Sequence, residues 1–272
     1  MTEFVRIPLD VWQRFRGASN EVMGSAVVDE DAVAITLPAP MPSPAPAPAA
    51  SEGAERFFVD SGKFYDFLRT NNMLGPKISA DEFSGCETII SACGRANWPV
   101  SWVAYALATA YHETAHTMLP VHERGGPAYL HRMYDINGNR PAKARELGNL
   151  APGDGVKYAG RGYPQTTGKS NYAKATAALR SLGFEDIDLI ARPDDMMRPD
   201  VAAATMISGM EKGWFTGRKI TDDLPDQNTP ATLAQFIPSR DVINGRDKDD
   251  EIAVYAIDFQ TGLVAGGYRP LA

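Results

Sequence analysis

Apolar residues recur at three- and four-residue spacing along most of the chain after residue 55, which is the spacing of one face of an α-helix. Strictly alternating apolar and polar positions, which predict β-strands, are sparse. The glycine-rich stretch 125–168 predicts long loops with short hairpins, and loops of that length usually line a site. We therefore expect a mainly α domain, with helices over residues 57–71, 79–94, 100–117, 171–182, 199–213, 230–237 and 248–262.

Composition divides the chain into three segments. Proline occupies every second position from 38 to 48, so residues 38–54 predict a Pro/Ala-rich linker, because such a stretch forms neither helix nor sheet ladder. Residues 1–37 hold one short amphipathic piece, 9–15, and are too few to bury a core, so we expect a disordered tail or a small anchor. Residues 55–272 form the folded domain.

The charge balance and hydropathy narrow the class of protein. The formal net charge of −7 argues against nucleic-acid binding, which needs a basic face to displace counterions. The first residues lack the apolar run of a secretory signal, and no stretch reaches the roughly 18 apolar residues of a membrane span. We expect a monomer that is made and kept in the cytoplasm without stable membrane insertion.

The two cysteines, Cys86 and Cys93, fall seven residues apart on one predicted helix. At 1.5 Å per residue they would lie about 10 Å apart along its axis, too far for a disulfide. We expect two small buried thiols.

The stretch 160–172 combines flexible glycines with amide, hydroxyl and aromatic groups and contains no carboxylate, which suits a neutral polymer such as a sugar chain. Upstream, Glu113 falls near the end of a predicted buried helix, where partial desolvation favours the protonated form of a general acid. Glu123 follows in a glycine-containing loop, where a solvated carboxylate can serve as a base toward water. Two such carboxylates suggest glycosidic bond hydrolysis, although both could be ordinary surface glutamates.

Two other motifs compete with this interpretation. His112, Glu113 and His116 match the His-Glu-x-x-His signature of zinc proteases, and His122 falls where one class places a third ligand. That class needs a glycine where this chain has Leu119, so the extended motif is broken. The sequence 168–170 ends like a phosphate-binding loop, but its first glycine is replaced by Tyr163.

Six stretches together resemble a known family, the family 19 glycoside hydrolases, which include plant-type chitinases and phage endolysins acting as lysozymes. The resemblance covers most of the chain after residue 55 and implies a lysozyme-like, bilobal helical domain with a central substrate cleft. Thr166, Arg246 and the short spacing between the two glutamates depart from the plant-type pattern, and the spacing is similar to that of the phage branch. The stretches are 108–114, 147–149, 153–155, 160–172, 192–194 and 242–245.

The resemblance also implies roles for single residues. Glu113 would be the general acid, Glu123 the base and Thr167 the hydroxyl that holds the attacking water, with Asp135 a substitute candidate for the base. Arg161 would organise its loop by pairing with a carboxylate or with carbonyl groups. The substrate-binding residues implied are Arg161, Tyr163, Gln165, Asn171, Tyr172 and Asn244.

The function expected from these observations is that of an endolysin. It would hydrolyse the β-1,4 bond between N-acetylmuramic acid and N-acetylglucosamine of peptidoglycan by an inverting reaction, with the carboxyl groups about 6.5–9.5 Å apart. It would need no metal or cofactor and would wait in the host cytoplasm until a separate protein permeabilised the membrane. A chitinase, a zinc protease using His112 and His116, and a non-catalytic wall-binding module are the alternatives.

Overall fold

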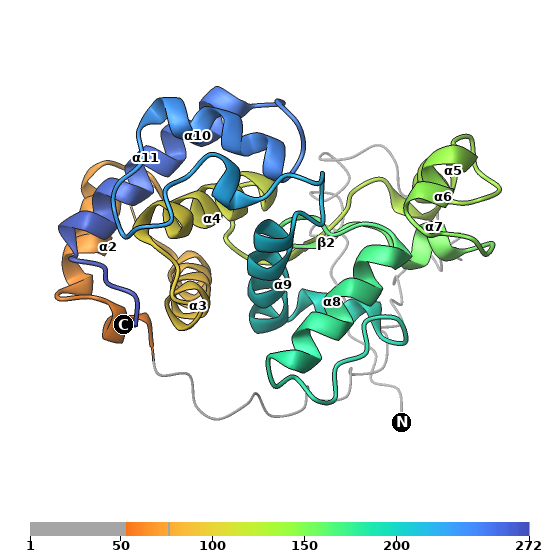
Figure 1. Ribbon diagram of the computed structural model, residues 1–272, viewed down its shortest axis with the longest axis horizontal. Coiled ribbons are helices and arrows are strands. Elements are labelled where there is room, and N and C mark those ends of the chain that lie inside the picture. Colours follow the sequence, from red (N-terminus) through yellow and green to blue (C-terminus); the bar gives the residue numbers. More distant parts are fainter. Residues whose placement is uncertain (1–52, 76, 272) are drawn as a thin grey trace, which may run out of the picture. The chain divides into compact units, whose positions relative to one another are not determined.

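The computed structural model describes residues 53–75 and 77–271 (Figure 1). The predictions for the N-terminal segment 1–37, and for all but the end of the linker 38–54, lie outside these residues.

The described part of the chain is mainly helical, which confirms the predicted fold class. Each of the seven helices predicted from hydrophobic spacing has a counterpart with similar bounds (Figure 1). These are α2 (Ser61–Thr70), α3 (Ala80–Arg95), α4 (Val100–Glu113), α8 (Lys169–Ser181), α9 (Pro199–Lys212), α10 (Leu233–Ser239) and α11 (Asp249–Ala265). Short 3₁₀ helices lie before or between them: η1 (Ala54–Phe57), η2 (Pro193–Met197), η3 (Ile220–Asp222) and η4 (Arg240–Val242).

The stretch 125–168 differs from the prediction of long loops, because it contains three short helices: α5 (Gly126–Tyr134), α6 (Pro141–Glu146) and α7 (Asp154–Lys157). Its glycines and prolines begin helices instead of interrupting them. Gly125 and Gly153 are N-cap residues with φ of 120° and 91°, and Pro141 opens α6. Proline is well tolerated in the first turn, where its missing N–H has no helical partner.

Short hairpins were also predicted in this region, but the one named strand that the described residues place there, β2 (Arg161–Gly162), pairs with a strand that lies before it. Strand β1 (Val121–His122) pairs antiparallel with β2, so that Val121 lies opposite Gly162. This pairing joins the segment that follows α4 to the start of the 160–172 stretch.

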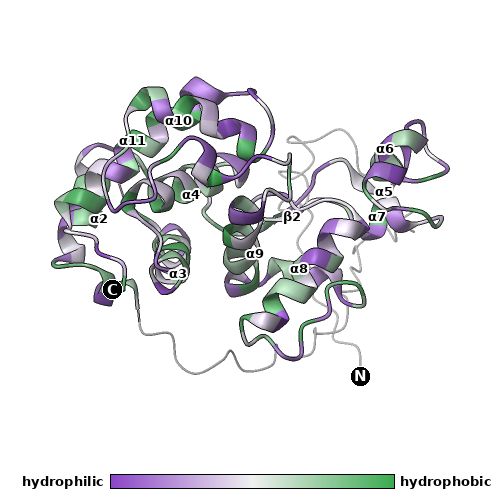
Figure 2. Ribbon diagram, in the orientation of Figure 1, coloured by the Kyte–Doolittle hydropathy of each residue, from purple (hydrophilic) through white to green (hydrophobic). Residues whose placement is uncertain are grey.

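The larger hydrophobic cluster surrounds α4, whose residues 100–111 are all buried. Helices α3 and α11 contact α4, and α2 and α10 in turn contact α11. The alanines at 104, 106 and 108 allow neighbouring helices to approach closely. Figure 2 shows both green and purple residues on α11, and its apolar residues Ile252, Phe259 and Leu263 are buried in this cluster.

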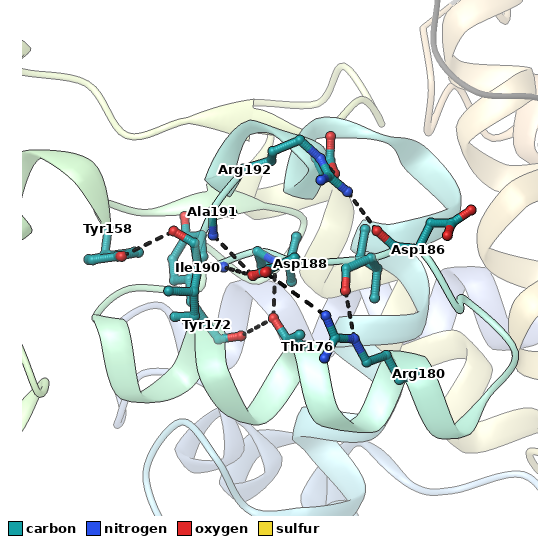
Figure 3. Close-up of polar contacts among 12 residues, drawn as sticks. Tyr158, Tyr172, Thr176, Arg180, Asp186, Asp188, Ile190, Ala191 and Arg192 are labelled. Carbon is teal, nitrogen blue, oxygen red and sulfur yellow. Dashed lines mark hydrogen bonds and ion pairs between the residues drawn. The ribbon is translucent and has the colours of Figure 1, made fainter.

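A second, smaller cluster lies between α8 and α9 and includes Tyr158, Tyr172 and Leu179. The loop after α8 is fixed to that helix by polar contacts (Figure 3). Arg180 Nε donates to the carbonyl of Ile187 at 2.9 Å, and Leu189 N donates to Thr176 Oγ1 at 3.0 Å. These contacts fix the helix that carries Tyr172 and Asn171.

Two further sequence predictions can be compared with the structure. Cys86 and Cys93 are buried, free thiols on α3, as predicted, and burial raises the pKa of both. Within residues 53–75 and 77–271, no helix is both long and apolar enough to cross a membrane.

Candidate active site

Glu113 is the last residue of α4, and the chain turns sharply directly after it. Thr114 is the C-cap; its hydroxyl donates to the carbonyl of Ala110 and accepts from the N–H of Met118. Ala115 and His116 then adopt φ of 51° and 72°, which ends the helix four residues before the predicted boundary. The Glu113 side chain is 17% exposed and is held at the end of a rigid, buried element.

Arg240 binds Glu113 from the opposite end of the domain's sequence. Its Nη1 donates to Glu113 Oε1 at 2.8 Å, and its Nε donates to the carbonyl of Asp247 at 2.9 Å. The Arg240 side chain is 2% exposed, so this is a buried ion pair. Sequence reasoning did not identify Arg240, which lies two residues before the 242–245 stretch that carried the resemblance. For Glu113 it considered the effect of burial on the carboxyl group and no charged partner.

Glu123 follows β1 and is joined to Gly160 by two hydrogen bonds. Its N–H donates to the Gly160 carbonyl at 2.8 Å, and its Oε2 accepts the Gly160 N–H at 3.0 Å. Oε1 accepts the hydroxyl of Tyr134 at 2.7 Å. Burial, reinforced by this hydrogen bond, raises the pKa of Tyr134, so the hydroxyl keeps its proton and acts as the donor.

Both glutamates line one cleft with a volume of about 360 Å³, within the usual range for a small-molecule site. Six of the predicted site residues lie in its wall: Glu113, Glu123, Gln165, Thr167, Asn171 and Asn244. Sequence reasoning did not identify the remaining wall residues, which are Tyr134, Lys143, Leu147, Pro164, Phe215 and Ile243. Leu147, Pro164 and Ile243 fall within the stretches that carried the resemblance, but no role was assigned to them. Tyr134, Lys143 and Phe215 fall outside those stretches.

The 165–171 wall is built by hydrogen bonds from its own side chains. Gln165 adopts a φ of 51°, and its Nε2 donates to the carbonyl of Val121, which ties this loop to β1. Thr167 Oγ1 donates to the carbonyl of Gln165, and Asn171 Nδ2 donates to that of Thr167. The polar groups of the cleft are thus positioned before any ligand arrives.

Arg161 is buried and does not line the cleft, but it does organise its loop as predicted. Its Nε pairs with Asp194 Oδ1 at 2.9 Å, and its Nη1 donates to the carbonyls of Lys157 and Ala159 and to the Tyr172 hydroxyl. Both kinds of partner that we expected, a carboxylate and carbonyl groups, are present.

Tyr163 and Tyr172, predicted to bind substrate, are fully buried and outside the cleft wall. Tyr172 faces inward from α8, packs on Tyr158 at 5.4 Å between ring centroids and donates its hydroxyl to the carbonyl of Ala159 at 2.8 Å. The prediction that these two tyrosines bind substrate is wrong, because a fully buried ring cannot contact a polymer. Their aromatic character serves packing beneath the wall.

Asp135, the substitute candidate for the base, is also buried and outside the cleft wall. Its carboxylate accepts the N–H groups of Asn137, Gly153 and Gly155 at 3.1, 2.7 and 3.2 Å. Desolvation opposes ionisation, but these backbone donors outweigh it and lower the pKa of Asp135. Its role is to hold the start of α7 against the end of α5.

The zinc-protease motif loses its geometric basis, because α4 ends at Glu113 and His116 lies beyond the helix. The His116 ring stacks on Tyr111 at 4.1 Å between centroids, and His122 is exposed on β1. In the part of the chain that the structure describes, no three His, Cys, Asp or Glu side chains are grouped to hold a metal ion.

Comparisons with known proteins give similarity only to solved structures. No protein-family model and no curated protein sequence matches the chain. The structure of a chitinase C mutant is similar with a TM-score of 0.46 at 18% identity, over 82% of this chain and 99% of that one. Chitinase C from Streptomyces griseus has the same TM-score at 19% identity, over 79% of each chain. At this identity, the chemistry of the site rests on its own residues.

Proposed function

We propose that this chain is an inverting glycoside hydrolase of the lysozyme type, acting on the β-1,4 bond between N-acetylmuramic acid and N-acetylglucosamine in peptidoglycan. The observation that carries the proposal is that Glu113 and Glu123, from separate elements, line one cleft whose other polar groups are mostly amides and hydroxyls. Paired carboxylates across a groove suited to a glycan are the usual requirement for this reaction.

Glu113 is the general acid in this scheme. Arg240 holds Oε1, which leaves Oε2 to carry the proton that passes to the leaving oxygen. The guanidinium then stabilises the carboxylate that remains after the transfer, in a partly buried site where electrostatic interactions are strong. Because the pair is fixed at the end of α4, little reorganisation accompanies the reaction.

Glu123 is the general base. Tyr134 and Gly160 each donate to one of its oxygens, and a carboxylate offers about four lone-pair positions, so it can still accept a proton from water. Thr167 lies in the same wall and positions that water with its hydroxyl. The water attacks the sugar from the face opposite to the leaving oxygen, which inverts the anomeric carbon.

The biological role that fits this activity is that of a phage endolysin. The protein would remain monomeric in the host cytoplasm until a separate membrane-permeabilising protein lets it reach the wall. Chitin is the second candidate substrate, because the amide and hydroxyl groups of the cleft suit a neutral polymer of N-acetylglucosamine.

The test compares Glu113→Gln and Glu123→Gln with wild type on permeabilised bacteria and on chitin oligosaccharides. Glu185→Gln, an exposed residue on the loop after α8, is the matched control. We expect each cleft variant to lose nearly all release of reducing ends from peptidoglycan while remaining folded. Retention of more than about a tenth, a change below about 1.4 kcal/mol in barrier, contradicts the assigned role.

The same assay separates the alternatives. Activity on chitin but not on peptidoglycan would make the chain a chitinase. Binding to peptidoglycan without reducing ends would make it a wall-binding module. Proton NMR of the first product distinguishes inversion, which yields the α-anomer from a β-bond, from retention.

A further inference from the structure

The segment from Arg124 to Glu146, which includes α5 and α6, is basic although the whole chain carries a net charge of −7. We call residues 124–146 the basic lobe. Helices α5 and α6 contact each other and lie beside α7 (Figure 1). The lobe contains two acidic residues, Asp135 and Glu146, and five cationic ones: Arg124, Arg132, Arg140, Lys143 and Arg145.

The cationic side chains of the lobe face solvent, whereas one of its two carboxylates does not. The four arginines are exposed and Lys143 is partly exposed. Asp135 is fully buried and its oxygens bind backbone N–H groups. Glu146 is therefore the one acidic side chain that the lobe exposes, and the lobe presents a positive surface to solvent.

The basic lobe borders the candidate cleft. Tyr134 from α5 and Lys143 from α6 are part of the cleft wall, next to Glu123. Lys143 is the one lysine or arginine among the wall residues described by the structure. A glycan bound between Glu113 and Glu123 would thus lie beside the Lys143 ammonium group, and the exposed arginines belong to the same lobe.

The partner of Lys143 can be exchanged for a substrate group. Its Nζ pairs with Glu146 Oε1 at 2.8 Å, within one turn of α6, and the Glu146 side chain is 67% exposed. Exposed pairs of this kind contribute little stability, because water screens them and two long side chains lose freedom. A carboxylate arriving with the substrate can therefore replace Glu146.

We propose that the basic lobe, with Lys143 at the cleft edge, binds the carboxylates that peptidoglycan carries on the stem peptides of its muramic acid residues. This inference rests on the proposed function, and it names the carboxylates as the feature of peptidoglycan that the proposed active site recognises. Chitin has no carboxylate, so the lobe favours peptidoglycan over chitin. Long-range attraction from several cations also raises the rate of encounter with an anionic polymer.

The experiment uses purified peptidoglycan sacculi, either native or with their carboxylates converted to amides by carbodiimide and ammonia. Wild type is compared with Lys143→Gln and with the triple variant Arg132→Gln, Arg140→Gln and Arg145→Gln. Lys77→Gln, an exposed lysine before α3, is the control. Two quantities are measured on both kinds of sacculi: the release of reducing ends and the amount of protein that cosediments. Each is expressed as the ratio of its value on native sacculi to its value on amidated sacculi.

We expect wild type to prefer native sacculi by about tenfold at low salt and to lose that preference as ionic strength rises past about 0.15 M. Both lobe variants bring the ratio toward one, whereas Lys77→Gln keeps it. A ratio of one for wild type, or a lobe variant that keeps the wild-type ratio, overturns the inference. Because cosedimentation needs no cleavage, a protein that binds as expected but releases no reducing ends overturns the proposed function alone.

Discussion

Arg240 Nη1 lies 2.8 Å from Glu113 Oε1, although 127 positions separate the two residues in the chain. The contact joins η4 to the end of α4, and the guanidinium is almost completely buried. A buried arginine whose fork binds both a carboxylate and a backbone carbonyl is fixed in orientation, and it fixes the carboxylate in turn. This relationship makes Arg240 a positioning residue for the proposed acid.

Replacement of Arg240 by alanine should reduce both activity and stability. Removing the buried guanidinium leaves Glu113 Oε1 and the Asp247 carbonyl without their donor, which should cost about 1–3 kcal/mol. We expect loss of activity by at least about a hundredfold, because the acid loses the group that holds it. Arg240→Lys should recover part of the stability but little activity, since lysine cannot bind Asp247 O and Glu113 together. Denaturant unfolding and reducing-end assays measure the two effects.

Arg246 provides the control for this prediction. It lies in the same loop, is 67% exposed and pairs loosely with Asp241 at 3.7 Å. Arg246→Ala should change the free energy of unfolding by less than about 0.5 kcal/mol. If Arg240→Ala behaves like Arg246→Ala, the pair seen in the structure does not support the site.

The Tyr134 hydroxyl should contribute to catalysis through Glu123. Tyr134→Phe removes one of the two donors to this carboxylate and leaves the Gly160 N–H in place. We expect kcat to fall about tenfold, equivalent to about 1.4 kcal/mol of barrier. Tyr129→Phe, on the same helix but outside the cleft wall, should retain activity within about twofold. Equal kcat values for the two variants would remove Tyr134 from the mechanism.

The elements that sequence reasoning predicted best are those with long apolar periodicity. Helices α3 and α9 begin and end within about two residues of the predicted positions, because hydrophobic spacing and capping act together there. Ser79 forms a capping box with Glu82, for example. The predicted end of α4 was wrong. The chain turns there through the positive φ values of Ala115 and His116, and the His116 ring packs against Tyr255 of α11, which lies far away in the sequence.

Only part of the site was predicted, because the sequence does not show which way a side chain points or which distant residue it contacts. Motif residues on loops, such as Thr167 and Asn244, line the cleft as expected. Tyr163 and Tyr172 could not be separated from surface aromatics, because their direction depends on tertiary packing: Tyr163 belongs to the larger hydrophobic cluster, and Tyr172 on α8 belongs to the smaller one. Arg240 lacked any local signal, since its partner Glu113 lies in a distant part of the sequence.

Gly160 should be required because of its close contact with Glu123. An added Cβ would lie 2.9 Å from Glu123 Oε2 and 3.0 Å from Gln165 Oε1, so both side chains would have to move. We expect Gly160→Ala to lower kcat at least about tenfold, because small displacements of a catalytic carboxylate are costly. Gly53→Ala, where the nearest atom is 3.4 Å away, is the matched control and should keep full activity. A fully active Gly160→Ala would show that Glu123 tolerates displacement.

Asp135 should contribute stability that depends on pH. Its pKa is lowered in the folded protein, so its contribution is present above the unfolded pKa of about 4 and is lost as pH falls through the folded value. Asp135→Asn removes the charge and places an amide NH₂ group against N–H donors. This should lower the free energy of unfolding by about 2–3 kcal/mol at neutral pH. The difference from wild type in free energy of unfolding should therefore shrink as pH falls below about 4. Urea titrations at pH 7 and in the acid range test this, and a difference that grows in acid would show that the carboxylate is not held in its ionised form.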